Sequence, residues 1–288
     1  MDVDQVLGAL TGAAVLAAGL ALVWPVSATR RQRRVATWAR TNLVTLSPEI
    51  AEALDRSMQR RNRIAGVAIS IAGIGMSALL VTGWDGLTPA WMLVVAMGIS
   101  LSLAAVWQLQ RNWFKPSDFR SARVREVTID DYVPRIVRLC VWAVGALCLA
   151  AVVASAITVP HPDAAPIALG TGVLAAVVVA EWGGRRAAGS PQPARDAVEL
   201  YAQDAWRSEV TRNGFQNIPL WGGQAMMQFT WPDGSVLHAI SRIAALGTMA
   251  IAIVILLMSI SGAAWTRRRL WPQLGPGQYV GFASGVRA

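Results

Sequence analysis

The feature that most constrains this chain is the distribution of its charged residues. They are gathered into clusters, and six of the stretches between clusters contain no Asp, Glu, Lys, Arg or His. A helix of about 20 residues crosses a hydrocarbon layer roughly 30 Å thick, and these stretches are close to that length. They comprise residues 6–23, 64–81, 90–109, 139–159, 164–180 and 243–264. A soluble fold has too little polar surface to carry six such segments, so the sequence predicts an integral membrane protein.

We therefore expect an all-α integral membrane fold, because a helix satisfies its own backbone hydrogen bonds in lipid. Its main part is a six-helix transmembrane bundle with a small cytoplasmic helix-plus-hairpin insertion. The expected organisation has a five-span membrane region over residues 1–182, with cytoplasmic loops at 24–63 and 110–138, and a cytoplasmic insertion over 183–242. The last transmembrane helix covers 243–266, and residues 267–288 form a C-terminal tail.

The positions of the arginines predict the orientation in the membrane. Positively charged residues stay on the cytoplasmic side. Asp2 and Asp4 precede the first apolar run and an arginine cluster follows it, whereas loops 82–89 and 160–163 contain no Lys or Arg. We expect a multi-pass protein of the cell (inner) membrane of a bacterium, with its N-terminus outside and its main loops cytoplasmic. The acidic N-terminus also disfavours a cleaved signal peptide.

The C-terminal arginines conflict with six crossings. Arg267, Arg268 and Arg269 follow the last run, but an even number of crossings leaves them outside. A seventh crossing through residues 215–231 removes the conflict. That stretch is uncharged, yet it carries three Gln, one Asn and Pro219, so it is less apolar than the other runs. The sequence favours six spans and leaves a crossing or re-entrant segment at 215–231 as the alternative.

The insertion at 183–242 shows the pattern of a folded unit. A linker over 189–193 leads into a helical pattern over 194–212, which ends at Asn213-Gly214. Residues 226–231 and 236–240 then flank a Pro-Asp-Gly-Ser turn, which is typical of a β-hairpin. We expect one helix and one hairpin in this unit.

Small residues indicate where helices pack closely in lipid. In the first run they are Gly8 and Gly12. In the fifth run they form a longer stripe of Ala168, Gly172, Ala176 and Ala180. We expect packing within the bundle, and homo-oligomerisation is the alternative use of the same residues.

Two arginine clusters are the candidate lipid contacts. The net charge of +9 is compatible with nucleic-acid binding, but most arginines lie just beyond the ends of apolar runs, where membrane topology already explains them. We expect no nucleic-acid partner and a bilayer with an anionic inner leaflet instead. The residues expected to contact that leaflet are Arg30, Arg31, Arg33, Arg34, Arg60, Arg61 and Arg63.

Residue patterns for catalysis or cofactor binding are sparse. We predict no catalytic, cofactor-binding or metal-binding residue, and His161 and His238 are expected on opposite sides of the membrane. Glu181 is expected to pair with Arg185 on one helix surface. Asp130 and Asp131 are interpreted as a solvated helix start, or as a contact for a cytosolic protein.

Two functional hypotheses follow. The first is a non-enzymatic membrane scaffold, or a regulatory or partner subunit, that docks a cytosolic protein through its cytoplasmic loops. The second is a transporter or permease subunit for a neutral or lipid-like solute. It rests on a similarity between two apolar hairpins, since a shift of 75 positions places Arg60 on Arg135 and Trp107 on Trp182, and internal repeats are common in transporters.

Overall fold

The described residues of the computed structural model are helical almost throughout. They comprise residues 3–24, 26–81, 126–160, 164–229, 231, 235–260, 262–275 and 277–281. Within these ranges there is no strand, and the only β-type pairing is an isolated parallel bridge between Val44 and Val280. The all-α prediction is confirmed for this part of the chain.

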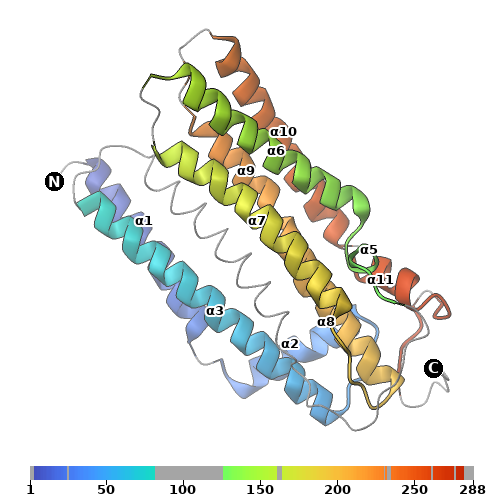
Figure 1. The fold of residues 1–288 in the computed structure, drawn as a ribbon. Coiled ribbons are helices and arrows are strands. Elements are labelled where there is room, and N and C mark those ends of the chain that lie inside the picture. Colours follow the sequence, from blue (N-terminus) through green and yellow to red (C-terminus); the bar gives the residue numbers. More distant parts are fainter. Residues whose placement is uncertain are drawn as a thin grey trace.

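The described helices form two groups that meet at one end of the molecule (Figure 1). One group is the hairpin of α1 and α3 with the short α2 beside it, and the other is a bundle of α6, α7, α8–α9 and α10. The bounds are α1 Val3–Val23, α2 Ala28–Thr41, α3 Pro48–Val81, α5 Ile129–Tyr132, α6 Arg135–Thr158, α7 Ala164–Gly189, α8 Ala197–Gln216, α9 Ile218–Met227, α10 Val236–Ile260 and α11 Gly262–Leu270.

Three helical segments among the described residues are long and apolar enough to cross a membrane. They are Arg135–Thr158, Pro166–Gly189 and Val236–Leu257, and they contain most of the last three apolar runs of the sequence. A fourth is reached if Gly12–Val23 and Ala28–Thr41, which meet at a bend of 85°, count as one broken span. The described chain therefore has three to four candidate spans and does not reach the predicted six. The predicted run at 90–109 lies outside the described residues.

The bundle buries a continuous apolar core and exposes apolar side chains on its outside. Val141, Val144, Val177 and Phe215 are fully buried in its centre. On the outer surfaces of α6, α7 and α10, large apolar side chains are exposed, including Ile157, which is 78% exposed. Such surfaces are stable only in an apolar surrounding, in agreement with helices that cross a membrane.

The hairpin predicted around the Pro-Asp-Gly-Ser turn is wrong. Residues 226–227 end α9, and the segment expected to form the second strand is the start of α10. Val236, Ile240 and Ile243 are all exposed, with spacings of four and three residues that place them on one helix face. Five residues are too few to distinguish this pattern from a strand.

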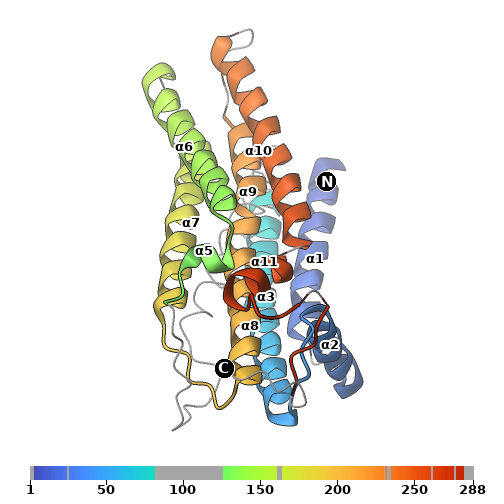
Figure 2. The ribbon, with the colours of Figure 1, turned by 90° about the vertical axis from the view of Figure 1, so that its right-hand side faces the viewer.

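The α9 helix lies in the middle of the bundle and not at its end. A Cβ atom on Gly222 would collide with Val144 of α6, and one on Gly223 would lie 2.6 Å from Thr248 Oγ1 of α10. Both neighbours are near the midpoints of their helices. The α8–α9 segment therefore rises through the bundle, and α10 returns beside it (Figure 2).

Because α8–α9 rises through the bundle, two residues lie at the other end of the bundle from the one predicted. His238 and Arg242 lie in the first two turns of α10, at the end of the bundle where α6 ends and α7 begins. They had been assigned to a cytoplasmic insertion on the side of the arginine clusters. In the structure they lie at the opposite end of α10 from Arg267, Arg268 and Arg269 of α11.

The α1–α3 hairpin is held by a close approach of two backbones. A Cβ atom on Gly19 would lie 2.6 Å from the backbone nitrogen of Ser70, and one on Gly66 would lie 2.6 Å from the carbonyl oxygen of Gly19. Only glycine allows this separation, because any side chain would push the helices apart.

A second core fills the end where the two groups meet. We call this region the arginine-end module and define it as α2, residues 48–63 of α3, α8, α11 and residues 271–281. Its buried side chains include Trp38, Leu54, Tyr201, Trp206 and Trp271. Most residues of α8 are buried, because this helix is shared between the module and the bundle.

Candidate functional site: the ion-pair junction and the arginine-end module

The short helix α5 positions two carboxylates at the start of the bundle. Asp131 accepts hydrogen bonds through Oδ2 from the backbone nitrogen of Thr128 (2.9 Å) and from its hydroxyl (3.2 Å), an arrangement that fixes the first turn of a helix. The chain then bends at Val133-Pro134 and continues as α6. Asp131 is completely buried.

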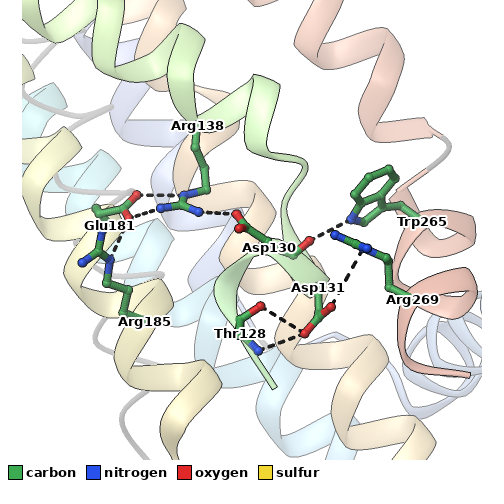
Figure 3. A network of polar contacts seen from close by, with 8 residues as sticks. All are labelled: Thr128, Asp130, Asp131, Arg138, Glu181, Arg185, Trp265 and Arg269. Carbon is green, nitrogen blue, oxygen red and sulfur yellow. Dashed lines mark hydrogen bonds and ion pairs between the residues drawn. The ribbon is translucent and has the colours of Figure 1, made fainter. Parts of the chain in front are cut away.

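Arg138 connects α5 and α6 with α7 (Figure 3). It donates from Nε to Glu181 Oε2 at 3.0 Å and from Nη2 to Glu181 Oε1, and its Nη1 pairs with Asp130. Glu181 also accepts a hydrogen bond from Arg185 Nε at 2.8 Å. A paired fork of this kind holds a carboxylate at a defined distance and angle. The ends of α6 and α7 are therefore fixed relative to one another.

The α11 helix is attached to the same place. Trp265 Nε1 donates to the backbone oxygen of Asp130 at 3.2 Å, and Arg269 Nε lies 3.9 Å from Asp131 Oδ1 (Figure 3). We call this set of contacts the junction; it consists of Thr128, Asp130, Asp131, Arg138, Glu181, Arg185, Trp265 and Arg269. Its three carboxylates face three guanidinium groups, so its charges are balanced.

The junction has the chemistry of a structural clamp. Asp130 and Glu181 accept hydrogen bonds from arginines, and Asp131 accepts them from Thr128 and forms an ion pair with Arg269. The cations of the junction are arginines, which keep their protons. Among the described residues there is no group of three or more His, Cys, Asp and Glu side chains that could hold a metal ion. The arrangement can hold four helices together and transmit a displacement of one of them to the others.

The sequence predicted part of the junction. The Glu181–Arg185 pair is present, but the stronger fork from Arg138 on the neighbouring helix was missed. Asp130 and Asp131 do lie in the first turn of a helix, α5, as interpreted, and the side chain of Asp130 is 39% exposed. Asp131 is not solvated, because it is fully buried. Arg138 and Glu181 are 43 residues apart, and Trp265 and Asp130 are 135 residues apart. No local spacing rule covers such distances.

Asp204 is a second buried centre, which the sequence did not identify. Tyr132 Oη donates to its Oδ1 at 3.3 Å and Gln192 Nε2 to the same atom at 2.8 Å, while Trp271 Nε1 donates to its Oδ2 at 2.9 Å. Asp204 is 1% exposed. These donors come from α5, the linker before α8 and the C-terminal segment, so one carboxylate on α8 joins three separate parts of the chain.

Glu209, one turn further along α8, attaches the first group of helices. It accepts hydrogen bonds from Trp38 Nε1 at 2.6 Å and from Arg61 Nη1 at 2.7 Å. The Arg61 guanidinium also lies over the ring of Trp206, 5.2 Å from its centre. The α2 and α3 helices are thus bound to α8 by charged contacts as well as by apolar packing.

Burial changes the pKa values of two side chains in the module. Burial raises the pKa of the Tyr201 phenol, although the nearby Arg267 opposes the change. The hydroxyl of Tyr201 donates to the backbone oxygen of Asn42 at 2.7 Å. Burial lowers the pKa of Arg207, whose Nη1 donates to the backbone oxygens of Ala187 and Ser190, each at 2.9 Å. Tyr201 thus connects α8 with the residue after α2, and Arg207 connects α8 with the end of α7 and the linker that follows it.

The arginines expected to contact lipid have different roles in the structure. Arg31 pairs with Asp55 and Arg61 with Glu209, so these two are engaged within the protein. Arg30, Arg33 and Arg63 are exposed, and Arg34 and Arg60 are half-buried.

The small residues predicted to pack between helices differ in how deeply they are buried. Ala176 and Ala180 are each 2% exposed in the core of the bundle, Gly172 is half-buried, and Ala168 is exposed. Gly12 is buried, and Gly8 lies in α1 outside the residues whose burial is described. Close helix approaches occur at other glycines, among them Gly19, Gly66, Gly222 and Gly223.

In the part of the chain that the structure describes, the fold is all-helical, with three to four helices able to cross a membrane and a folded module held by ion pairs at one end of them. Comparisons with protein-family models, with curated proteins and with solved structures found no match.

Proposed function

We propose that this protein is a non-enzymatic scaffold or partner subunit of a bacterial cell membrane, which docks a cytosolic protein on its arginine-end module. The observation that carries the proposal is the construction of this module. Two carboxylates of α8, the buried Asp204 and the half-buried Glu209, tie together segments from both groups of helices. A preformed surface of this kind presents a partner with a rigid platform, which lowers the entropic cost of binding.

The distribution of exposed apolar side chains supports an aqueous surrounding for the module. Large exposed apolar residues are frequent on α6 and α10, but none occurs in residues 27–63, in α8 or in α11. Among the described residues after α11, only Tyr279 is of this type. A surface without such residues suits water, and hence a cytosolic partner.

For the finer topology we propose seven crossings instead of six. The crossings would be α1, the second half of α3, residues 90–109, α6, α7, residues 213–231 with α9, and α10. Counted from an outside N-terminus, this arrangement leaves residues 267–269 in the cytoplasm with the other arginine clusters, as the positive-inside rule requires. Arg242 is the exception, since it would lie on the outer side. The mid-bundle contacts of Gly222 and Gly223 support the added crossing.

Reporter fusions test this topology. We expect a cytoplasm-active reporter to function after residues 215 and 288, and an exported phosphatase to function after residue 234. A chain with six crossings gives the reverse result after 234 and 288, because 215–231 would then stay inside. The fusion after 215 is inside in both arrangements and serves as the control.

Affinity purification in mild detergent tests the docking. Arg33→Glu combined with Arg40→Glu changes two exposed charges on α2 without removing a buried contact. We expect a co-purifying protein with the wild-type chain, and about tenfold less of it with this variant, a difference of about 1.4 kcal/mol. The control is Leu246→Ala on the exposed surface of α10. Recovery of the bare chain in all three cases, or equal loss in both variants, would contradict the proposal.

A transporter or permease subunit is the second candidate. The interruption between α8 and α9 at Asn217 favours it, because broken helices line the binding sites of many transporters. The packed core around Val144, Val177 and Phe215, each fully buried, argues for the scaffold. A gene for an ATPase next to the gene of this protein would favour the transporter.

A further inference from the structure

An open groove lies between α2 and the beginning of α3, away from the junction. Its volume is about 620 Å³. The walls are mostly small apolar side chains, among them Val35, Ala36, Ala39, Leu46 and Ala51. Small side chains on both walls leave a channel wide enough for a chain of methylene groups or for a compact polar group.

The charged residues of the groove have opposite signs on its two walls. Arg31 and Gln32 stand on α2, and Glu52 and Asp55 stand on α3. The groove is bridged by a long ion pair between Arg31 Nη1 and Asp55 Oδ2, at 3.4 Å. Among the described residues, neither Arg31 Nε nor Asp55 Oδ1 has a hydrogen-bond partner. Both of these atoms are buried, so the groove presents an occupant with the charges of its walls, a guanidinium on α2 and two carboxylates on α3. An occupant that carries both a negative and a positive charge would match them.

The position of the groove indicates an amphiphilic occupant. The apolar part of α1 ends at Val23, Trp24 is 74% exposed, and α2 begins at Ala28 after a bend of 85°. Exposed tryptophan at the end of an apolar helix is typical of the headgroup layer. In the proposed topology, the groove therefore opens next to the inner headgroups.

We propose that this groove binds one phospholipid with a phosphoethanolamine headgroup. The phosphate accepts hydrogen bonds from Arg31 and Gln32, and the primary ammonium donates to Asp55 and Glu52. The glycerol and the first methylene groups lie on the apolar walls. This inference rests on the proposed membrane arrangement and adds a specific lipid to it.

The proposed headgroup is selected by its two charges. A phosphoglycerol headgroup has no cation for Glu52 and Asp55, and a phosphocholine headgroup has no N–H to donate. General attraction between the arginines and the inner leaflet predicts the opposite order, with anionic lipid bound best. The order of lipid preference therefore separates a specific site from diffuse attraction.

The test measures lipids retained by the full chain. The purified, delipidated chain is exposed to equal amounts of phosphatidylethanolamine, phosphatidylcholine and phosphatidylglycerol, and bound lipid is quantified by native mass spectrometry. We expect phosphatidylethanolamine to exceed each of the others about tenfold, since one or two charge-assisted hydrogen bonds distinguish them. Ala36→Trp fills the groove and should abolish this preference. Thr37→Trp, at the next and likewise exposed position of α2, is the matched control and should keep it.

Glu52→Gln provides a second variant, because Glu52 is exposed and its only described ion pair is a surface contact with Arg56 at 3.5 Å. It should reduce the preference over phosphatidylcholine and leave folding unchanged. Equal retention by Ala36→Trp and Thr37→Trp, or strongest retention of phosphatidylglycerol, overturns the inference. Failure of the proposed function is distinguishable, because reporter topology and partner recovery do not depend on the headgroup. If the topology and partner-recovery tests succeed and no lipid preference is found, only the inference about the lipid is overturned.

Discussion

Single side chains at the helix ends decide how the bundle is held together. Glu181 has a side chain that is 7% exposed, and it accepts hydrogen bonds from Arg138 on α6 as well as from Arg185 on its own helix. A buried carboxylate without its partner is strongly destabilising, whereas an exposed pair contributes little. The two arginines should therefore differ greatly in importance, although both contact the same carboxylate.

Replacement of Arg138 by alanine should lower the free energy of unfolding by about 3–5 kcal/mol, because Glu181 and Asp130 both lose a partner. Arg185→Ala should cost less than about 1 kcal/mol, since the side chain of Arg185 is 68% exposed. Denaturation of both variants in detergent micelles measures the difference. Similar losses in the two variants would contradict the assignment of Arg138 as the main clamp.

At the scale of elements, α9 determines the arrangement of the bundle. Gly222 and Gly223 allow its backbone to approach α6 and α10 at the middle of these helices. If these glycines carried side chains, the segment between α8 and α10 could not lie within the bundle. The Gln and Asn side chains of that segment would then lie at the surface of the bundle. The course of α9 is thus a consequence of two missing side chains.

Gly222→Ala should destabilise the bundle by about 1–3 kcal/mol, because the added methyl group would overlap with Val144. The matched control is Gly214→Ala in α8, where an added Cβ atom meets nothing within 4 Å. The control should be neutral or gain up to about 1 kcal/mol, the usual advantage of alanine over glycine in a helix. Thermal unfolding in detergent distinguishes the two variants, and an equal response would argue against the close packing of α9.

At the scale of the whole molecule, α8 is shared by two cores. Phe215, near its end, belongs to the core of the bundle, and Tyr201 and Trp206 belong to the core of the arginine-end module. The C-terminal segment closes the module, with Trp271 packed against Tyr201 and bound to Asp204. A partner that binds the module is therefore mechanically connected with the helices of the bundle.

Trp271→Phe should reduce stability by about 1–3 kcal/mol, because it removes the indole donor from a buried carboxylate while it keeps most of the packing. Trp271→Ala should cost about 3–5 kcal/mol, since packing is lost as well. Limited proteolysis should cut both variants faster than the wild type within the module and leave the bundle resistant. Uniform cleavage along the chain would indicate that the module and the bundle do not have separate cores.

The sequence by itself determined which segments are helical and apolar. The run at 139–159 lies almost entirely within α6, and the helix predicted at 194–212 is observed as α8 at Ala197–Gln216. Both follow from local composition, because the length of an uncharged run and the signals at its ends are encoded in neighbouring residues. The same local rules failed at 236–240, where five residues fit two periodicities.

Only the tertiary structure decided which residues meet. The contacts that define the junction and the module join residues far apart in the chain, 43 residues for Arg138 with Glu181, 67 for Asp204 with Trp271 and 171 for Trp38 with Glu209. Each depends on the rotation and depth of two helices, which are set by packing over their whole length and not by the residues in contact. The apolar runs of the sequence therefore predict where the helices lie in the chain. Which helices lie next to one another is determined by the packing of glycines and buried charges.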